Sequence, residues 1–222
     1  QRPWRGLYVI TRPPPPGGRE LSDEVAAAIA GGARWVQYRD KGVDRGQRRE
    51  EAAALARLCR RCQVPLIVND DPRLAAEVEA DGVHLGRDDS ALRPARRLLG
   101  PLAIIGVSCY DRLDRARDAQ AAGADYLAFG RFFPSRSKPR AVPAGIELLH
   151  AARREFYLPL VAIGGITPEN GRALVRAGVK SPAKGAHLLR HTAATEMLRQ
   201  GVPLEQIGSV LRHRGVDTTA YY

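Results

Sequence analysis

The 222-residue sequence lacks the features that define several protein classes. Its three cysteines are too few for a disulfide-stapled secreted scaffold. Aromatic residues make up 6% of the chain, and no apolar run approaches the ~20 residues that a membrane-spanning helix needs. No basic-then-apolar leader precedes the first apolar run, and from the start at Gln1 we expect a trimmed or partial chain. These absences indicate a globular protein of the cytoplasm.

The cysteines also give no metal site. Cys59 and Cys62 form a CxxC motif, but it lies within a helical pattern and no second pair follows. A structural zinc ion needs four ligands, so core or helix-face positions explain both residues better. Cys109 stands alone. Free thiols without a pairing scheme fit a reducing compartment.

The net charge of +11 raises the question of a nucleic-acid ligand. Residues 181–222 carry a surplus of only +2, and the remaining positive charge is spread over the first 180 residues among interleaved acids. A dispersed basic surface favours anionic ligands, phosphates included, without specifying DNA.

Short apolar runs alternate with helical patterns along most of the sequence. The expected strands are Leu7–Ile10, Trp35–Arg39, Leu66–Val68, Gly82–Leu85, Ala103–Val107, Tyr126–Phe129 and Leu160–Ile163. The expected helices are Leu21–Ala30, Gly46–Cys62, Arg73–Ala80, Ala91–Leu99, Asp111–Ala122, Ile146–Arg154 and Pro168–Ala177. Seven such units predict an α/β fold of the (β/α)₈ TIM-barrel type, with an open doubly wound sheet as the alternative.

The pattern changes near residue 180. An eighth apolar strand should follow Gly178, but the segment from Val179 to Gly185 cannot supply one. Helical patterns resume at His187–Gln200 and Pro203–Leu211. We therefore predict a barrel that lacks its eighth strand (1–179), followed by a short all-α tail (180–222).

Polar residues recur at the carboxyl ends of the expected strands, where barrel enzymes place their chemistry. Two carboxylates, cationic side chains, hydroxyls and a glycine pair on one rim suit a magnesium–diphosphate site. The pattern argues for a phosphorylated substrate and names no reaction. The residues are Gln37, Arg39, Lys41, Asn69, Asp70, Asp71, Asp88, Asp89, Ser108, Ser135, Arg136, Ser137, Lys138, Gly164 and Gly165.

Several motifs on these strands resemble thiamine phosphate synthase. They are GLYVIT (6–11), GARWVQYRDK (32–41), LIVNDD (66–71), DGVHLGRDD (81–89), GADYLAFGRFFPSRSK (123–138) and VAIGGITPEN (161–170). The resemblance implies a (β/α)₈ barrel that joins a pyrimidine diphosphate to a thiazole phosphate, releasing pyrophosphate. A related barrel family, the thiazole tautomerases, shares some motifs, but the complete diphosphate set favours the synthase.

The resemblance also implies roles for individual residues. Gln37, Arg39, Lys41 and Asn69 would hold the pyrimidine diphosphate, and Asp70 and Asp89 would bind Mg²⁺. Ser108 and Lys138 would contact the pyrimidine substrate, and Ser135, Arg136, Ser137 and Gly165 the thiazole phosphate. Arg39, Lys41 and Lys138 would stabilise the departing pyrophosphate. His84 ends an apolar strand, where packing or hydrogen bonding is a better explanation than catalysis.

The tail resembles the C-terminal catalytic segment of a tyrosine recombinase of the phage integrase family. The carrying residues are HLLRHTAAT (187–195), Leu211-Arg212-His213 and Tyr222. By resemblance His187, Arg190 and His213 belong to the active site, and Tyr222 is the nucleophile. The alternative is an amphipathic helical tail. Because the fragment lacks the rest of the cationic cluster, we expect weak DNA binding and no strand cleavage.

Two unrelated segments joined near residue 180 suggest a fusion of gene fragments or an assembly error. A barrel without its last strand would expose two strand edges. We therefore expect thiamine phosphate synthase activity to be reduced or lost in this chain, with a fragment for DNA integration or recombination as the competing function.

Overall fold

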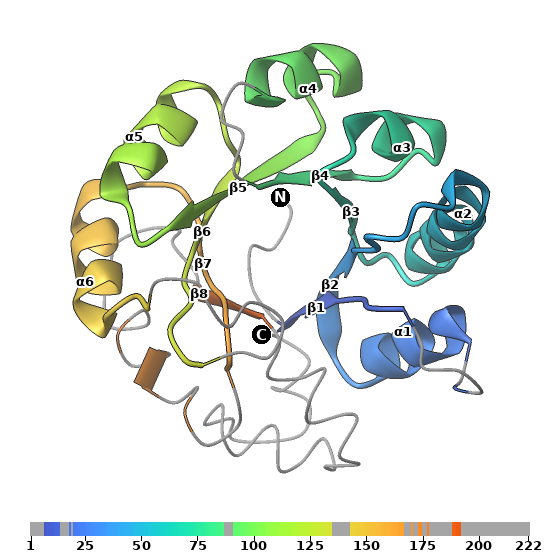
Figure 1. Cartoon of the computed structure of the whole chain (residues 1–222), viewed down its shortest axis with the longest axis horizontal. Coiled ribbons are helices and arrows are strands. Elements are labelled where there is room, and N and C mark those ends of the chain that lie inside the picture. Colours follow the sequence, from blue (N-terminus) through green and yellow to red (C-terminus); the bar gives the residue numbers. More distant parts are fainter. Residues whose placement is uncertain are drawn as a thin grey trace.

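The computed structural model describes residues 7–13, 18, 20–86, 91–134, 143–166, 170, 173–174, 177 and 188–191. Strands and helices alternate through these residues (Figure 1). The strands are β1 (Leu7–Ile10), β2 (Ala33–Tyr38), β3 (Leu66–Asn69), β4 (Gly82–Leu85), β5 (Ile104–Tyr110), β6 (Tyr126–Phe129), β7 (Leu160–Ala162) and β8 (Leu188–His191). The helices are α1 (Leu21–Ala30), α2 (Arg45–Arg61), α3 (Pro72–Glu77), α4 (Leu92–Leu99), α5 (Leu113–Ala121) and α6 (Ile146–Glu155).

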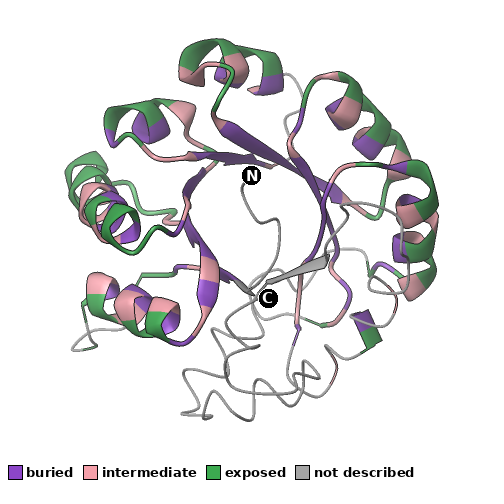
Figure 2. Ribbon diagram, turned by 180° about the vertical axis from the view of Figure 1, so that it is seen from behind, coloured by how far each residue is buried: buried purple, intermediate pink, exposed green. Residues whose placement is uncertain are grey.

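All the strand pairs are parallel and follow chain order around a closed barrel, β1-β2-β3-β4-β5-β6-β7-β8. The described helices lie outside the strands, and most residues of β2 to β7 are buried (Figure 2). Strands buried on both faces are near-continuous apolar runs, which is why the sequence pattern located β1 to β7. Among the described residues, no helix is both long and apolar enough to span a bilayer.

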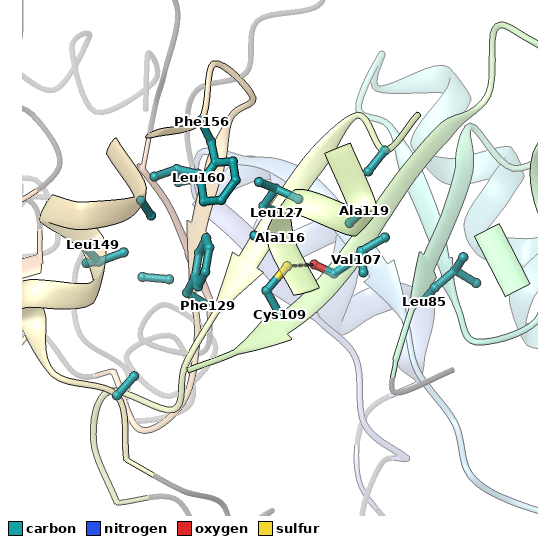
Figure 3. Close-up of a cluster of buried hydrophobic side chains, with 14 of the residues drawn as sticks. Leu85, Val107, Cys109, Ala116, Ala119, Leu127, Phe129, Leu149, Phe156 and Leu160 are labelled. Atoms are coloured by element: carbon teal, nitrogen blue, oxygen red, sulfur yellow. Dashed lines mark hydrogen bonds between the residues drawn. The ribbon is translucent and has the colours of Figure 1, made fainter. Parts of the chain in front are cut away.

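The layer between the strands and the helices is packed with small side chains. Ala116 and Ala119 of α5 and Ala152 of α6 are buried against Leu127, Phe129 and other strand residues (Figure 3). Alanine on the inner face of a helix lets the helix approach the strands closely. The buried Cys109 belongs to this layer, and its thiol donates a 3.6 Å hydrogen bond to the carbonyl of Val107.

The barrel interior forms a second, separate core. It is built from Tyr8, Trp35, Ile67, Ile104, Tyr126, Ala128 and Val161, with Ile163 packed against it. Along β2, Trp35 belongs to this core while Val36 and Tyr38 belong to the outer layer, as the two-residue period of a strand requires. Gln37 shares the inward face with Trp35, which brings a polar side chain into the barrel.

The expectation that the barrel lacks an eighth strand is wrong. Leu188–His191 forms β8, which pairs with β7 through Leu160↔Leu188 and with β1 through Leu7↔Arg190. The expected helix from His187 to Gln200 is wrong over the same residues. Without β8, β1 and β7 would leave backbone groups unpaired, and this demand overrides a local helical pattern. The all-α tail was expected over 180–222, and apart from β8 these residues lie outside the described part.

Arg96 of α4 connects the segments that precede β5 and β6, at the N-terminal end of the strands. Its guanidinium donates hydrogen bonds to the carbonyls of Ala103 (2.5 Å) and Gly123 (3.0 Å) and to the carboxylate of Asp125 (2.5 Å). Asp125 in turn accepts a 2.7 Å hydrogen bond from the backbone N–H of Ile105 at the start of β5. This cluster lies opposite the end where the candidate site residues gather, which indicates a role in stability.

Candidate active site

The end of β2 brings three predicted site residues to the rim at different depths. Gln37 is buried inside the barrel, Arg39 is half-buried, and Lys41 is exposed. The backbone N–H of Arg39 donates a 2.9 Å hydrogen bond to the Thr11 hydroxyl, and Thr11 N–H donates to the Gln37 carbonyl, also at 2.9 Å. These bonds fix the ends of β1 and β2 together, so the backbone that carries Arg39 is anchored.

The end of β3 holds a carboxylate at the rim beside β4. Asp70 has a left-handed backbone (φ 59°), and its N–H donates a 2.8 Å hydrogen bond to the carbonyl of His84. Its exposed carboxylate accepts a 2.8 Å hydrogen bond from the Asn69 amide and lies close to Gly86. A backbone held in this region by its neighbours is typical of functional sites. Asp71 instead caps α3, accepting from the Leu74 N–H at 3.0 Å.

A continuous chain of hydrogen bonds crosses the interior below the rim. The Gln37 amide donates to the Tyr8 hydroxyl at 3.0 Å, and the Tyr8 and Tyr126 hydroxyls lie 2.9 Å apart. The Tyr126 hydroxyl lies 2.8 Å from Nδ1 of His84, and Nε2 of His84 lies 2.9 Å from the Ser108 hydroxyl. Hydrogen bonding was one of the two roles expected for His84, and the structure confirms it.

These five residues form a polar cluster within an apolar barrel. Tyr8, Gln37 and Tyr126 are each 1% exposed, and His84 and Ser108 are each 7% exposed. Burial raises the pKa of the Tyr8 and Tyr126 phenols well above their usual value. Both hydroxyls therefore keep their protons at physiological pH and act as neutral hydrogen-bonding groups.

Gly106 of β5 makes room for the Tyr126 ring. A Cβ at this position would lie 1.9 Å from Cζ and 2.3 Å from the hydroxyl oxygen of Tyr126. The ring is also stacked on His84, with centroids 5.6 Å apart and an interplanar angle of 24°. The Tyr126 hydroxyl reaches its partners because β5 offers no side chain at this point.

The end of β5 is irregular next to the site. The register between β5 and β6 shifts between Ser108 and Tyr110, and Tyr110 has a positive φ of 56°. The Arg115 guanidinium lies 5.4 Å from the centroid of the Tyr110 ring and donates a 3.4 Å hydrogen bond to the carbonyl of Gly86. Arg115 therefore adds a cationic side chain that links the ends of β4 and β5, and the sequence pattern gave no sign of it.

The segments after β6 and β7 pack directly on one another. The backbone N–H groups of Phe132 and Phe133 donate 3.1 Å hydrogen bonds to the carbonyls of Ile163 and Gly164. Gly165 has a φ of 63°, and a Cβ there would lie 2.2 Å from the carbonyl oxygen of Pro134. Only glycine fits such an approach, which brings Gly165 beside the start of the segment that continues into residues 135–138.

The remaining predicted site residues are not placed. The side chains of Asp88, Asp89, Ser135, Arg136, Ser137 and Lys138 lie outside the described residues, as do His187, His213 and Tyr222. Arg190 is described only through the backbone of β8. The structure thus brings together Gln37, Arg39, Asn69, Asp70 and Ser108 at one end of the barrel, with Lys41 exposed beyond them and Gly165 across the rim.

Sequence reasoning missed Tyr8 and Tyr126. Both lie in apolar strands and read as core residues, and they are 118 positions apart. The available signal was the inward-facing position of Tyr126, His84 and Ser108 on neighbouring strands, but only a known strand register makes it visible.

A closed parallel barrel with cationic, amide and carboxylate side chains at the carboxyl ends of its strands defines a TIM-barrel enzyme with a site suited to an anionic ligand. The family model "Thiamine monophosphate synthase" matches residues 7–187, and the model "Phage integrase family" matches residues 170–222. The chain belongs to the thiamine monophosphate synthase family and is a transferase of thiamine biosynthesis.

Relatives support this assignment over most of the chain. The thiamine-phosphate synthase of Thiobacillus denitrificans is 57% identical over 178 residues, covering 80% of this chain and 84% of the relative. The enzyme of Nitrosococcus oceani is 48% identical over 202 residues, covering 90% and 93%. The solved structure of thiamine phosphate pyrophosphorylase from Pyrococcus furiosus has a TM-score of 0.73 and 31% identity, and covers 95% of this chain and 98% of its own. The tautomerase and recombinase alternatives are not favoured.

Proposed function

We propose that the rim of this barrel condenses hydroxymethylpyrimidine diphosphate with thiazole phosphate, giving thiamine phosphate and pyrophosphate. The observation that carries the proposal is the convergence of Gln37, Arg39, Asn69, Asp70 and Ser108 at one end of a barrel of this family. The reason for expecting impaired activity was an open barrel. Because β8 closes the barrel, that reason no longer holds, and we expect the chain to be active.

The pyrimidine diphosphate would occupy the side of the rim formed by β2, β3 and β5. Arg39 and Lys41 would neutralise the diphosphate, and charge-assisted hydrogen bonds of this kind are stronger than neutral ones. Gln37, Asn69 and Ser108 would supply neutral donors and acceptors, with Lys138 completing the set. Arg39 is well suited because Thr11 anchors its backbone.

The donor set at the end of β3 fits a magnesium ion. Mg²⁺ takes one or two carboxylates and completes its shell with water and phosphate oxygens. The Asp70 carboxylate is exposed at the rim beside Gly86. Because Gly86 is close to Asp89 in the sequence, Asp70 and Asp89 would hold the ion. When bound, Mg²⁺ would neutralise charge on the diphosphate.

The chemistry needs no covalent nucleophile. Arg39, Lys41 and Lys138 would stabilise negative charge on the departing pyrophosphate, leaving an electrophilic methylene on the pyrimidine. The thiazole nitrogen would attack this carbon while Ser135, Arg136, Ser137 and Gly165 hold the thiazole phosphate. Much of the acceleration would come from holding both substrates together.

The test is formation of thiamine phosphate from both substrates with Mg²⁺, comparing Arg39→Ala with a matched arginine variant. Arg49→Ala is the control, because Arg49 is exposed on α2 and makes only a 3.9 Å ion pair with Glu77. We expect Arg39→Ala to lower kcat/KM by about 10²- to 10³-fold, the usual effect of removing a charge-stabilising donor. Absence of product with the unaltered chain, or equal rates for both variants, would refute the proposal.

We further propose that residues 180–222 derive from a tyrosine recombinase and bind DNA weakly without cleaving it. The match of residues 170–222 to the integrase family model supports this origin. An amplicon from genomic DNA across codons 170–195 would show whether the join exists. DNA retention that is unaffected by salt or by Arg190→Ala, or a covalent adduct through Tyr222, would contradict the binding proposal.

A further inference from the structure

The two adjacent carboxylates at the end of β3 have different surroundings. The Asp70 carboxylate is exposed at the rim and accepts a hydrogen bond from the Asn69 amide. Both oxygens of Asp71 are occupied. Its Oδ1 accepts a 3.0 Å hydrogen bond from the Leu74 N–H, and its Oδ2 accepts one of 3.1 Å from the Arg48 guanidinium. Asp70 therefore faces the rim, whereas Asp71 is fixed between α2 and α3.

Arg48 reaches Asp71 from the first turn of α2. The N-cap fixes this turn, because the Asp44 carboxylate accepts a 3.0 Å hydrogen bond from the Gln47 N–H and the Asp44 carbonyl accepts one of 3.2 Å from the Arg48 N–H. The Arg48 side chain is 20% exposed, and its Nε is buried with no hydrogen-bond partner among the described residues. Burying a guanidinium in this way is costly, and the ion pair with Asp71 offsets part of that cost.

The backbone next to this ion pair has an unusual conformation. Asp70 has a φ of 59°, in the left-handed region that residues other than glycine adopt rarely. Such a conformation persists where the surroundings hold it in place. On one side, the Asp70 N–H donates a 2.8 Å hydrogen bond to the His84 carbonyl. On the other side, Asp71 is held by Arg48 and by the start of α3, so the ion pair fixes the second flank of Asp70.

We propose that Arg48 is a positioning residue that, through Asp71, holds Asp70 in the conformation that presents its carboxylate to Mg²⁺. The inference rests on the proposed role of Asp70 as a metal ligand. Groups that orient a metal ligand without touching the ion typically contribute about 10- to 100-fold to metal affinity. Loss of Arg48 should therefore weaken metal binding and leave the reaction step largely intact.

Arg60 offers a matched control on the same helix. Its guanidinium donates a 3.0 Å hydrogen bond to the carboxylate of Glu79, which lies just after α3. Arg48 and Arg60 thus both connect α2 to a carboxylate beside α3, Arg48 at the rim and Arg60 at the opposite end of the barrel. Arg60→Met removes the same kind of contact far from Asp70. Thermal unfolding of both variants shows whether each is folded under the assay conditions.

The first experiment measures binding of the Mn²⁺–pyrophosphate complex to the full chain by water-proton relaxation, without turnover. We expect Arg48→Met to weaken binding about tenfold and Arg60→Met by less than about twofold. Asp70→Asn should weaken binding at least as much as Arg48→Met. If Asp70→Asn binds like the unaltered chain, the metal role of Asp70 is wrong and the inference falls with it. If Asp70→Asn weakens binding and Arg48→Met does not, the positioning role alone is overturned.

Asp71→Asn separates positioning from a direct effect of charge. Arg48→Met removes a positive charge and Asp71→Asn a negative one, yet both break the same ion pair, and asparagine can still accept from the Leu74 N–H. Positioning predicts weaker metal binding in both variants and no further loss when they are combined. If the charges acted directly on the ion, Arg48→Met would strengthen binding and Asp71→Asn would weaken it. Opposite shifts would overturn the proposal.

Steady-state kinetics provide a second readout and a rescue. In Arg48→Met the Mg²⁺ concentration that gives half the maximal rate should rise about tenfold, while kcat at saturating Mg²⁺ falls by less than about twofold. Arg48→Lys keeps the charge and a donor for Asp71, so it should restore most of the metal affinity. A lower kcat at saturating Mg²⁺ with an unchanged Mg²⁺ requirement would show general damage to the site and overturn the proposal.

Discussion

Replacing Gly106 with alanine should destabilise the barrel through a single steric conflict. The new Cβ would lie 1.9 Å from Cζ, 2.2 Å from Cε1 and 2.3 Å from the hydroxyl oxygen of Tyr126. Carbon atoms in contact prefer about 3.5–4.0 Å, so the ring must retreat by more than an ångström or β5 must move. The ring cannot retreat freely, because it is 1% exposed and packed against His84 and Tyr8.

The expected cost has two parts. Overpacking a well-packed core costs about 1–3 kcal/mol. Displacing the Tyr126 hydroxyl from its contacts with Tyr8 and His84 adds about 0.5–1.5 kcal/mol for each lost hydrogen bond. We therefore expect Gly106→Ala to lower the free energy of unfolding by about 2–6 kcal/mol, a large part of the 5–15 kcal/mol typical of a domain.

Urea denaturation measures this loss as a lower midpoint with an unchanged m-value. Gly46→Ala is the matched control. Gly46 lies in the first turn of α2, where a Cβ would contact only the Asp44 carboxylate at 3.3 Å, and alanine is the better helix former. Tyr126→Leu should recover part of the stability in the Gly106→Ala background while lowering it in the unaltered chain. A Gly106→Ala protein within about 0.5 kcal/mol of the unaltered one would refute the reasoning.

Three further predictions concern other parts of the barrel. Leu189→Pro should lower the free energy of unfolding by about 1–3 kcal/mol in urea titrations, because proline removes an N–H from the strand that closes the barrel. An unchanged free energy of unfolding would argue against β8. In native protein a thiol reagent at pH 8 should modify the exposed Cys62 and spare Cys59, because burial raises the pKa of the Cys59 thiol to about 12. Rapid modification of both thiols would contradict this prediction. Arg96→Met should lower the free energy of unfolding by about 1–3 kcal/mol, since Asp125 and three backbone carbonyls lose their donor. Thermal unfolding would detect this loss, and an unchanged midpoint would exclude a stabilising role.

Most of the barrel could be predicted from the sequence because a strand buried on both faces is a short apolar run. Tyr126–Phe129 was predicted without error, and β5 begins at Ile104, one residue after the predicted start. β8 could not be predicted, because Leu188–His191 lies in a helical pattern and becomes a strand only through the unpaired edges of β1 and β7. The need to pair the edges of β1 and β7 arises from the whole fold and leaves no signal in a short stretch of sequence.

The candidate site was predictable in outline for a similar reason. Gln37 lies near the end of β2 and Asp70 follows β3, and strand ends in a parallel barrel meet at one rim, so their approximate placement follows from order alone. The order of the strands does not predict the Tyr8–Tyr126 contact. This contact depends on the register of strands on different sides of the barrel and on the missing side chain at Gly106. Ser135 to Lys138 remain predictions.

The strand β8 shows what main-chain pairing alone supplies to the barrel. It joins the barrel through main-chain pairing over four residues, running parallel between β7 and β1. Backbone hydrogen bonds are available to every residue except proline, so a segment of suitable length and direction can close the ring. The strands that carry Gln37, Asp70 and Ser108 must keep particular side chains as well as pairing. Main-chain pairing alone therefore allows a segment of different sequence to close the barrel while the strands that carry these site residues stay unchanged.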